Sequence, residues 1–296
     1  MLDKVTRDIP SGLARGVKQV IKGAETSDGA GVNLTRYIAS PELDMFDPFL
    51  LLDAFRSDNP DDYIAGFPPH PHRGFETVTY LLEGNMRHKD SAGHEGLIRS
   101  GGVQWMTAGS GIEHSEMPEQ EQGLLYGFQL WVNLPASQKM ATPRYQEFEP
   151  VEIPIEKRLG GVDIKVIAGM TLEGTCGAVT DIAAAPIYFD VTIPAETKFH
   201  EIIPQGHNAF VYVIEGPLYI HGENRTTAVA SNSMALLDNG ERLELSSDDT
   251  ARFLLIAGRP FNEPVARYGP FVMNSEEEIQ QAFSDYRSGH FGHIKK

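Results

Sequence analysis

Short apolar runs separated by turn-forming residues dominate this chain and predict a β-rich fold. Four of these runs are rich in β-branched and aromatic residues, and Gly, Pro, Asn or Asp residues lie near their ends. The strands predicted from them cover residues 76–82, 127–132, 187–193 and 209–214. Long helical periodicity is scarce, so the pattern favours an all-β fold.

One segment near the end of the chain has the pattern of a helix instead. Ser275 and Glu278 have the spacing of a capping box, in which each side chain bonds the backbone of the first turn. Ile279, Phe283 and Tyr286 then fall on one apolar stripe, and a glycine follows shortly afterwards. The sequence therefore predicts a short C-terminal helix that packs on a β-domain.

Two stretches of the chain are repeated in approximate form. The sequence Tyr-Leu-Leu-Glu-Gly at 80–84 returns as Tyr-Val-Ile-Glu-Gly at 212–216, and the stretch 128–135 resembles 253–260. Repeats this far apart indicate two tandem domains rather than a solenoid. Three prolines between residues 137 and 156 are typical of a linker. We therefore expect one domain over residues 1–138 and a second over 139–296.

Two pairs of potential metal ligands are the most informative chemical feature of the sequence. His70 and His72 form one pair, and His114 and Glu116 form the other. Side chains two residues apart on a β-strand point to the same face, so each pair can direct both members at one point. If the two strands are neighbours, three nitrogens and one carboxylate oxygen converge, which suits a divalent transition metal better than calcium or magnesium.

A second carboxylate competes with Glu116 for the role of fourth ligand. Glu76 would face the same way as His70 and His72 if the strand were continuous. The spacing alone leaves both carboxylates open. When the first repeat is used to align the two halves, Ile202 and Pro204 occupy the positions of the first histidine pair, so we expect a single metal site in the N-terminal half.

The overall composition narrows the class of protein. The 296 residues carry a net charge of −16, which argues against a nucleic-acid surface and suggests no direct nucleic-acid partner. No apolar run reaches membrane-spanning length, and the first thirty residues lack the apolar stretch of a signal peptide. The single cysteine, Cys176, fits a reducing compartment and is expected to be a small buried residue. We therefore expect a cytoplasmic protein.

The metal-ligand segments resemble the cupin family of jelly-roll β-barrels, and more closely the two-domain pirins. The first cupin motif corresponds to Gly66, His70, His72, Glu76 and Gly84, and the second to residues 109–114 with Gly109 in place of the usual proline. The stretches that resemble pirin are 47–53, 70–78, 104–109, 111–118 and 268–274. This resemblance implies two tandem cupin β-barrels, of which the second is degenerate and has no metal ligands.

The resemblance to pirins also implies a metal and an activity. The ligands would be His70, His72, His114 and Glu116, and the expected metal is iron(II), with zinc, manganese, nickel, cobalt and copper as alternatives. Several pirins cleave the flavonol quercetin with dioxygen, so a metal-dependent quercetin 2,3-dioxygenase-like activity is expected. The alternative is a non-catalytic, iron-binding, redox-sensing regulator that docks on a partner protein.

For the enzyme, the substrates would be dioxygen and a small aromatic, flavonol-like molecule. Glu116 could then accept the proton of the flavonol hydroxyl as the catalytic base. Phe67, Phe75, Trp105 and Met106 are candidates for apolar walls of the site, although ordinary core packing is the expected role for at least half of them.

Overall fold

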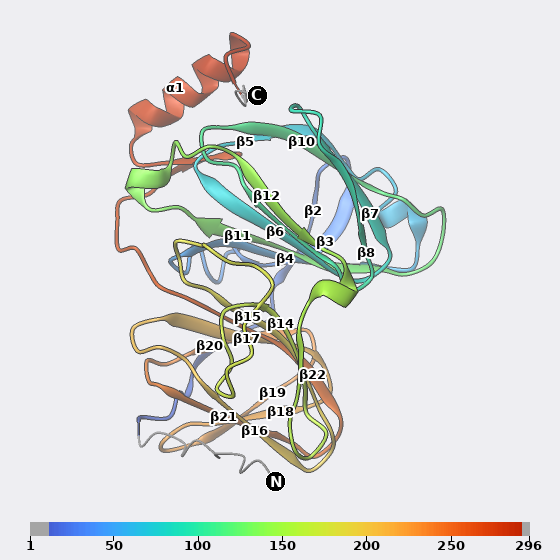
Figure 1. The fold of residues 1–296 in the computed structure, drawn as a ribbon, viewed down its shortest axis with the longest axis vertical. Coiled ribbons are helices and arrows are strands. Elements are labelled where there is room, and N and C mark those ends of the chain that lie inside the picture. Colours follow the sequence, from blue (N-terminus) through green and yellow to red (C-terminus); the bar gives the residue numbers. More distant parts are fainter. Residues whose placement is uncertain (1–11, 292–296) are drawn as a thin grey trace. The chain divides into compact units, whose positions relative to one another are not determined.

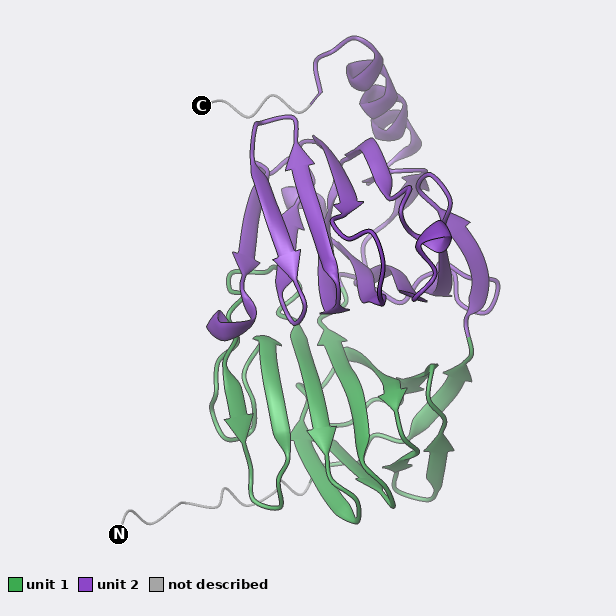
Figure 2. Ribbon diagram, turned by 90° about the vertical axis from the view of Figure 1, so that its right-hand side faces the viewer, with its two compact units in different colours: residues 1–22, 153–260 green, residues 23–152, 261–296 purple. Residues whose placement is uncertain are grey.

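The computed structural model describes residues 12–291 and has the predicted all-β architecture with one α-helix (Figure 1). The four predicted strands are confirmed as β6 (Phe75–Glu83), β11 (Leu125–Asn133), β15 (Ile187–Ile193) and β17 (Asn208–Glu215). The described chain divides into two compact units, shown in green (unit 1) and purple (unit 2) in Figure 2.

Unit 2 contains two antiparallel sheets. The larger sheet has the order β12-β9-β6-β11-β4-β3-β2, and the smaller has the order β5-β10-β7-β8. Their remaining strands are β2 (Ala24–Asp28), β3 (Val32–Ile38), β4 (Phe49–Ser57), β5 (Phe67–His72), β7 (Asn85–Asp90), β8 (Glu95–Arg99), β9 (Val103–Thr107), β10 (Ile112–Pro118) and β12 (Arg144–Phe148). Buried residues of both sheets, among them Leu34, Leu81, Met86 and Ile98, form one core cluster, so the two sheets face each other as in a barrel.

Unit 1 repeats this arrangement. Its larger sheet has the order β1-β20-β17-β22-β15-β14-β13, and its smaller sheet has the order β16-β21-β18-β19. The strands not yet given are β1 (Val17–Ile21), β13 (Ile155–Lys157), β14 (Asp163–Ala168), β16 (Thr197–Ile202), β18 (Leu218–His221), β19 (Thr226–Val229), β20 (Ser233–Leu237), β21 (Arg242–Ser247) and β22 (Ala251–Gly258). The echoed sequences lie on β6 and β17 and on β11 and β22, which hold the same positions in the two larger sheets.

The units are not the contiguous stretches expected from the sequence. Unit 1 combines residues 1–22 with 153–260, and unit 2 combines 23–152 with 261–296 (Figure 2). The division predicted at residue 138 therefore does not describe these units. The reason lies in the edge strands: β1 pairs with β20 in unit 1, whereas β12, which follows residue 138, pairs with β9 in unit 2.

A C-terminal segment completes unit 2. It consists of a hairpin, β23 (Ala266–Tyr268) and β24 (Phe271–Met273), followed by α1 (Glu276–Arg287). Ser275 caps this helix by accepting a hydrogen bond from the backbone N–H of Glu278, which confirms the predicted start. Ile279 is buried as predicted, while Tyr286 is exposed and Ala282 takes its place on the buried stripe. Within residues 12–291 there are also three short 3₁₀ turns, η1 (Pro60–Asp62), η2 (Ala136–Gln138) and η3 (Pro150–Glu152).

Aliphatic and aromatic side chains fill the barrel of unit 1. Its core cluster includes Phe199 of β16 and Leu243 and Leu245 of β21, the two strands that correspond to β5 and β10 of unit 2. Cys176, expected to be buried, is exposed. Among residues 12–291, no helix is long and apolar enough to cross a membrane.

Candidate metal centre

Strands β5 and β10 bring the three predicted histidines together in unit 2. The two strands pair antiparallel, and His114 lies directly opposite His70. The ring centroid of His70 is 4.6 Å from that of His72 and 4.5 Å from that of His114. One potential ligand atom from each of the three side chains lies within 4.8 Å of the other two. The i, i+2 spacing therefore brings His70 and His72 together, and the pairing of β5 with β10 adds His114.

The burial and protonation of the imidazole rings suit them to bind a cation. His72 and His114 are almost fully buried, and none of their four ring nitrogens has a hydrogen-bond partner in the described structure. Burial, reinforced by the neighbouring imidazoles, holds the pKa of both residues well below the ordinary value, so both are neutral at pH 7. His70 can donate from Nδ1 to the carbonyl oxygen of Pro68 at 2.8 Å, which would leave Nε2 as its acceptor. Buried, unpaired acceptors of this kind are costly unless a ligand binds them.

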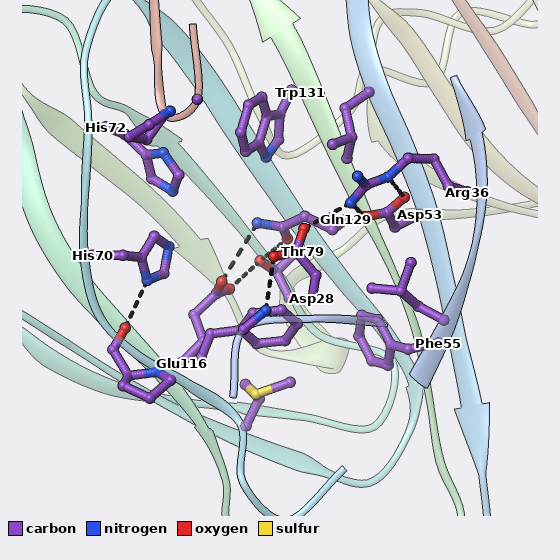
Figure 3. A pocket seen from close by; sticks show the side chains of 18 of the residues that line it. Asp28, Arg36, Asp53, Phe55, His70, His72, Thr79, Glu116, Gln129 and Trp131 are labelled. Atoms are coloured by element: carbon purple, nitrogen blue, oxygen red, sulfur yellow. Dashed lines mark hydrogen bonds and ion pairs between the residues drawn. The ribbon is translucent and has the colours of Figure 1, made fainter. Parts of the chain in front are cut away.

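Glu116 lies in the same pocket but outside the histidine cluster. The cluster of ligand atoms found among the described residues contains only the three histidines. The carboxylate of Glu116 instead accepts a 2.7 Å hydrogen bond from the hydroxyl of Thr79, and the amide of Gln129 lies 3.4 Å from its second oxygen (Figure 3). Its role as the fourth ligand stays a prediction.

The competing carboxylate, Glu76, does not share a strand with the histidines. The extended strand is interrupted between β5 and β6, at Gly74. Gly74 has a φ of +87°, and a Cβ atom at this position would lie 1.9 Å from the carbonyl oxygen of Val272. On β6, Glu76 is an odd number of residues from the pocket-lining Thr79, so it points to the opposite face of the strand. Glu76 would face the same way as His72 only in a continuous strand, so the interruption at Gly74 makes that prediction wrong.

A cavity of about 570 Å³ opens beside the histidines. Its apolar lining includes Leu34, Leu51, Phe55, Phe67 and Trp131. Of the four wall candidates taken from the sequence, only Phe67 lines this cavity.

The other three wall candidates, Phe75, Trp105 and Met106, are fully buried in the core. Phe75 nevertheless supports the site, because its ring lies 5.1 Å from that of His72 and 4.4 Å from that of Trp131.

Three polar or aromatic residues of the site escaped the sequence analysis. Thr79 and Gln129 hold Glu116, and Trp131 lies 5.2 Å from the ring of His72. All three lie on predicted strands, at 76–82 and 127–132, and Gln129 and Trp131 share one face of β11 by alternation. That alternation could have indicated them, but only once the inward face of each strand was known.

The chain matches two protein-family models and several known proteins. The Pirin family model matches residues 31–132, and the model of the pirin C-terminal cupin domain matches residues 188–292. The chain belongs to the pirin family. Among its relatives are a pirin-like protein of Caulobacter vibrioides, 53% identical over 94% of this chain and 99% of that protein, and human pirin, 42% identical over 95% of each chain.

A solved structure supports the same fold. The chain is similar to the crystal structure of quercetin 2,3-dioxygenase from Acinetobacter baumannii, with a TM-score of 0.85 and 34% sequence identity. The match covers 95% of this chain and 100% of that protein. The expectation of two cupin barrels with a C-terminal helix is therefore confirmed.

Proposed function

We propose that this protein is a metal-dependent dioxygenase that cleaves quercetin-like flavonols. The observation that carries the proposal is the set of three adjacent imidazoles, two of them buried and unpartnered, beside a largely apolar cavity of about 570 Å³. A cavity of this size suits a small aromatic ligand. The relationship to a protein described as quercetin 2,3-dioxygenase supports the choice of substrate.

The proposed metal is one divalent transition ion, with iron(II) first and zinc, manganese, nickel, cobalt or copper as alternatives. His70, His72 and His114 would hold it through neutral ring nitrogens, with Glu116 as the fourth ligand. When bound, such an ion supplies Lewis-acid and oxygen chemistry next to the substrate.

The protein side chains would supply the proton transfer and the environment. Glu116 is the proposed base that accepts the proton of the flavonol hydroxyl, and Thr79 and Gln129 fix the carboxylate that receives it. Apolar residues such as Phe55 and Phe67 would hold the flat rings and exclude water from the reacting centre.

The test is oxygen uptake with quercetin by protein loaded anaerobically with ferrous iron. The wild type should consume oxygen, whereas His114→Ala should lose both bound iron and uptake. His221→Ala is the matched control, because His221 lies in unit 1 and bonds Thr226 and Ser246 instead of the cluster. Wild-type protein that holds iron yet consumes no oxygen would contradict the proposal and favour the alternative, an iron-binding regulator that docks on a partner protein. For either function we propose a cytoplasmic location, because a single cysteine, Cys176, fits a reducing compartment.

A further inference from the structure

The cavity beside the histidines has two chemically different ends. In Figure 3, His70 and His72 lie on one side, the paired Arg36 and Asp53 lie on the other, and Trp131 lies between them. Charged groups therefore line the cavity at the end remote from the proposed metal. A ligand that fills the cavity from end to end would meet these groups with the part of the molecule that does not react.

The first cation of this remote end is already neutralised. Arg36 donates from Nε and Nη2 to the two carboxylate oxygens of Asp53 at 2.8 and 2.7 Å, and from Nη2 to Asp28 at 2.7 Å. Two carboxylates thus surround one guanidinium. Arg36 has little capacity left for an anionic ligand.

The second cation, Arg267, is not balanced in this way. It lines the same cavity and donates from Nη1 to the carbonyl oxygen of Leu50 at 2.8 Å. Within the described part of the chain, its other N–H groups have no hydrogen-bond partner and no carboxylate forms an ion pair with it. Arg36 and Asp53 both act on the charge of Arg267, which places this side chain near the same end of the cavity. Arg267 is half-buried, and because neither Asp53 nor Asp44 bonds it directly, its remaining N–H groups are available to an anion.

The position of Arg267 is fixed before any ligand arrives. Its Cζ atom lies 5.3 Å from the centroid of the Trp131 ring, which itself packs against Phe75 at 4.4 Å and against His72 at 5.2 Å. The cation–π contact and the bond to the Leu50 carbonyl restrain the guanidinium. The same indole therefore connects the cation to the proposed metal centre.

We infer that Arg267 determines specificity by binding an anionic oxygen, a phenolate or a carboxylate, on the end of the aromatic substrate remote from the metal. This inference rests on the proposed function for the location of the reacting end. The free N–H groups of a guanidinium can bind such an oxygen through charge-assisted hydrogen bonds. The substrate class then narrows from flavonols in general to flat aromatic molecules with a chelating hydroxyl–carbonyl pair at one end and an ionised oxygen at the other.

The experiment measures binding to the full-length, metal-loaded protein under anaerobic conditions, by quenching of tryptophan fluorescence. Three probes share the chelating end: 3-hydroxyflavone, its 4′-carboxylate derivative, and quercetin. The variants are Arg267→Met, which removes the charge, and Arg267→Lys, which keeps it. Arg56→Met is the matched control, since Arg56 also lies over an aromatic ring, that of Tyr126, but does not line the cavity.

The wild type should bind the carboxylate at least about tenfold more tightly than 3-hydroxyflavone, in line with the strength of a charge-assisted hydrogen bond. Arg267→Met should abolish this preference, Arg267→Lys should keep part of it, and Arg56→Met should keep all of it. A preference for quercetin that grows as its phenols ionise would identify phenolate as a ligand, whereas a pH-independent preference for the carboxylate alone would identify carboxylate.

The inference is overturned if the wild type shows no preference, or if Arg267→Met keeps it. Because the readout is binding, it separates this inference from the proposed function. A preference that depends on Arg267 in a protein that consumes no oxygen would refute the dioxygenase and leave the anion site standing. Oxygen uptake without any such preference would support the dioxygenase and refute the anion site.

Discussion

Arg73, the residue after His72, donates from Nη1 to the carboxylate of Asp285 on α1 at 2.7 Å. Its Nε donates to the carbonyl oxygen of Ser110 at 2.7 Å, and its guanidinium lies 4.6 Å from the ring centroid of Phe291. The side chain is only 4% exposed. One buried cation thus connects β5, the turn before β10 and the C-terminal helix, so the helix helps to hold both histidine segments in place.

Replacing the carboxylate of this pair should destabilise unit 2. Asp285→Ala leaves the buried guanidinium of Arg73 without its counter-charge, and we expect the free energy of unfolding to fall by about 1–3 kcal/mol. Urea denaturation followed by circular dichroism measures it. Glu149→Ala is the control, because its partner Arg99 is exposed and such pairs contribute about 0–1 kcal/mol. Equal losses in the two variants would contradict a special role for Asp285.

The proposed base can be tested while the three histidine ligands stay in place. Glu116→Gln keeps the shape of the side chain but cannot accept a proton, so turnover of quercetin should fall by about 100-fold or more while the three histidines retain iron. Steady-state oxygen uptake and iron analysis measure the two effects. Glu113→Gln is the control on the same strand, since Glu113 alternates to the other face of β10. Full turnover by Glu116→Gln would refute the assignment.

A buried carboxyl should make stability depend on pH. Burial raises the pKa of Glu76 from its usual 4.5 to about 7, although a 2.7 Å hydrogen bond from Thr107 opposes the shift. The folded state then favours the protonated form, so this contribution is present below pH 4.5 and is lost as pH rises through 7.

The upward shift of the Glu76 pKa corresponds to a loss of unfolding free energy on the order of 3 kcal/mol between pH 4.5 and pH 8. Glu76→Gln cannot ionise and should remove this part of the pH dependence, which denaturant unfolding at pH 5 and pH 8 measures. A variant that loses stability over this range as steeply as the wild type would show that another group is responsible.

A buried lysine should be a second determinant of stability in unit 2. The Nζ atom of Lys139 donates to the side chain of Asn133 and to the carbonyl oxygens of Gly74 and Val272 at 2.8 and 3.0 Å. Lys139→Met fills the space but leaves these acceptors buried and unbonded, so we expect a loss of about 2–4 kcal/mol in urea denaturation. Lys89→Met, at an exposed position of the same unit, should change little. If Lys139→Met left the free energy of unfolding unchanged, water would have to replace the lost donor.

The sequence predicted the local elements of this fold better than their assignment to units. Strand 187–193 was predicted to the residue, and the cap at Ser275 was correct, because β-alternation and capping depend on neighbouring residues. The pairing of β1 with β20 depends on residues more than 200 positions apart, and no local pattern indicates it. The compact units therefore differ from the two contiguous domains predicted from the sequence.

The candidate site shows the same distinction. Spacing within β5 predicted that His70 and His72 share one face, but His114 joins them only because β10 pairs with β5. Glu76 was misplaced because the glycine break between β5 and β6 is a tertiary feature, in which Gly74 approaches the backbone of Val272. Arg267 could not be assigned to the cavity from its sequence, because it reaches the cavity from the far end of the chain.

The discontinuous units impose an order on biosynthesis. The ribosome completes the histidine-bearing strands early, but β23, β24 and α1, which supply Arg267 and Asp285, are translated only after all of unit 1. In unit 1, β1 is made first and must wait for β20. Because β23, β24 and α1 follow residue 260, the nascent chain cannot complete the cavity wall that carries Arg267 before the barrel of unit 1 has been made.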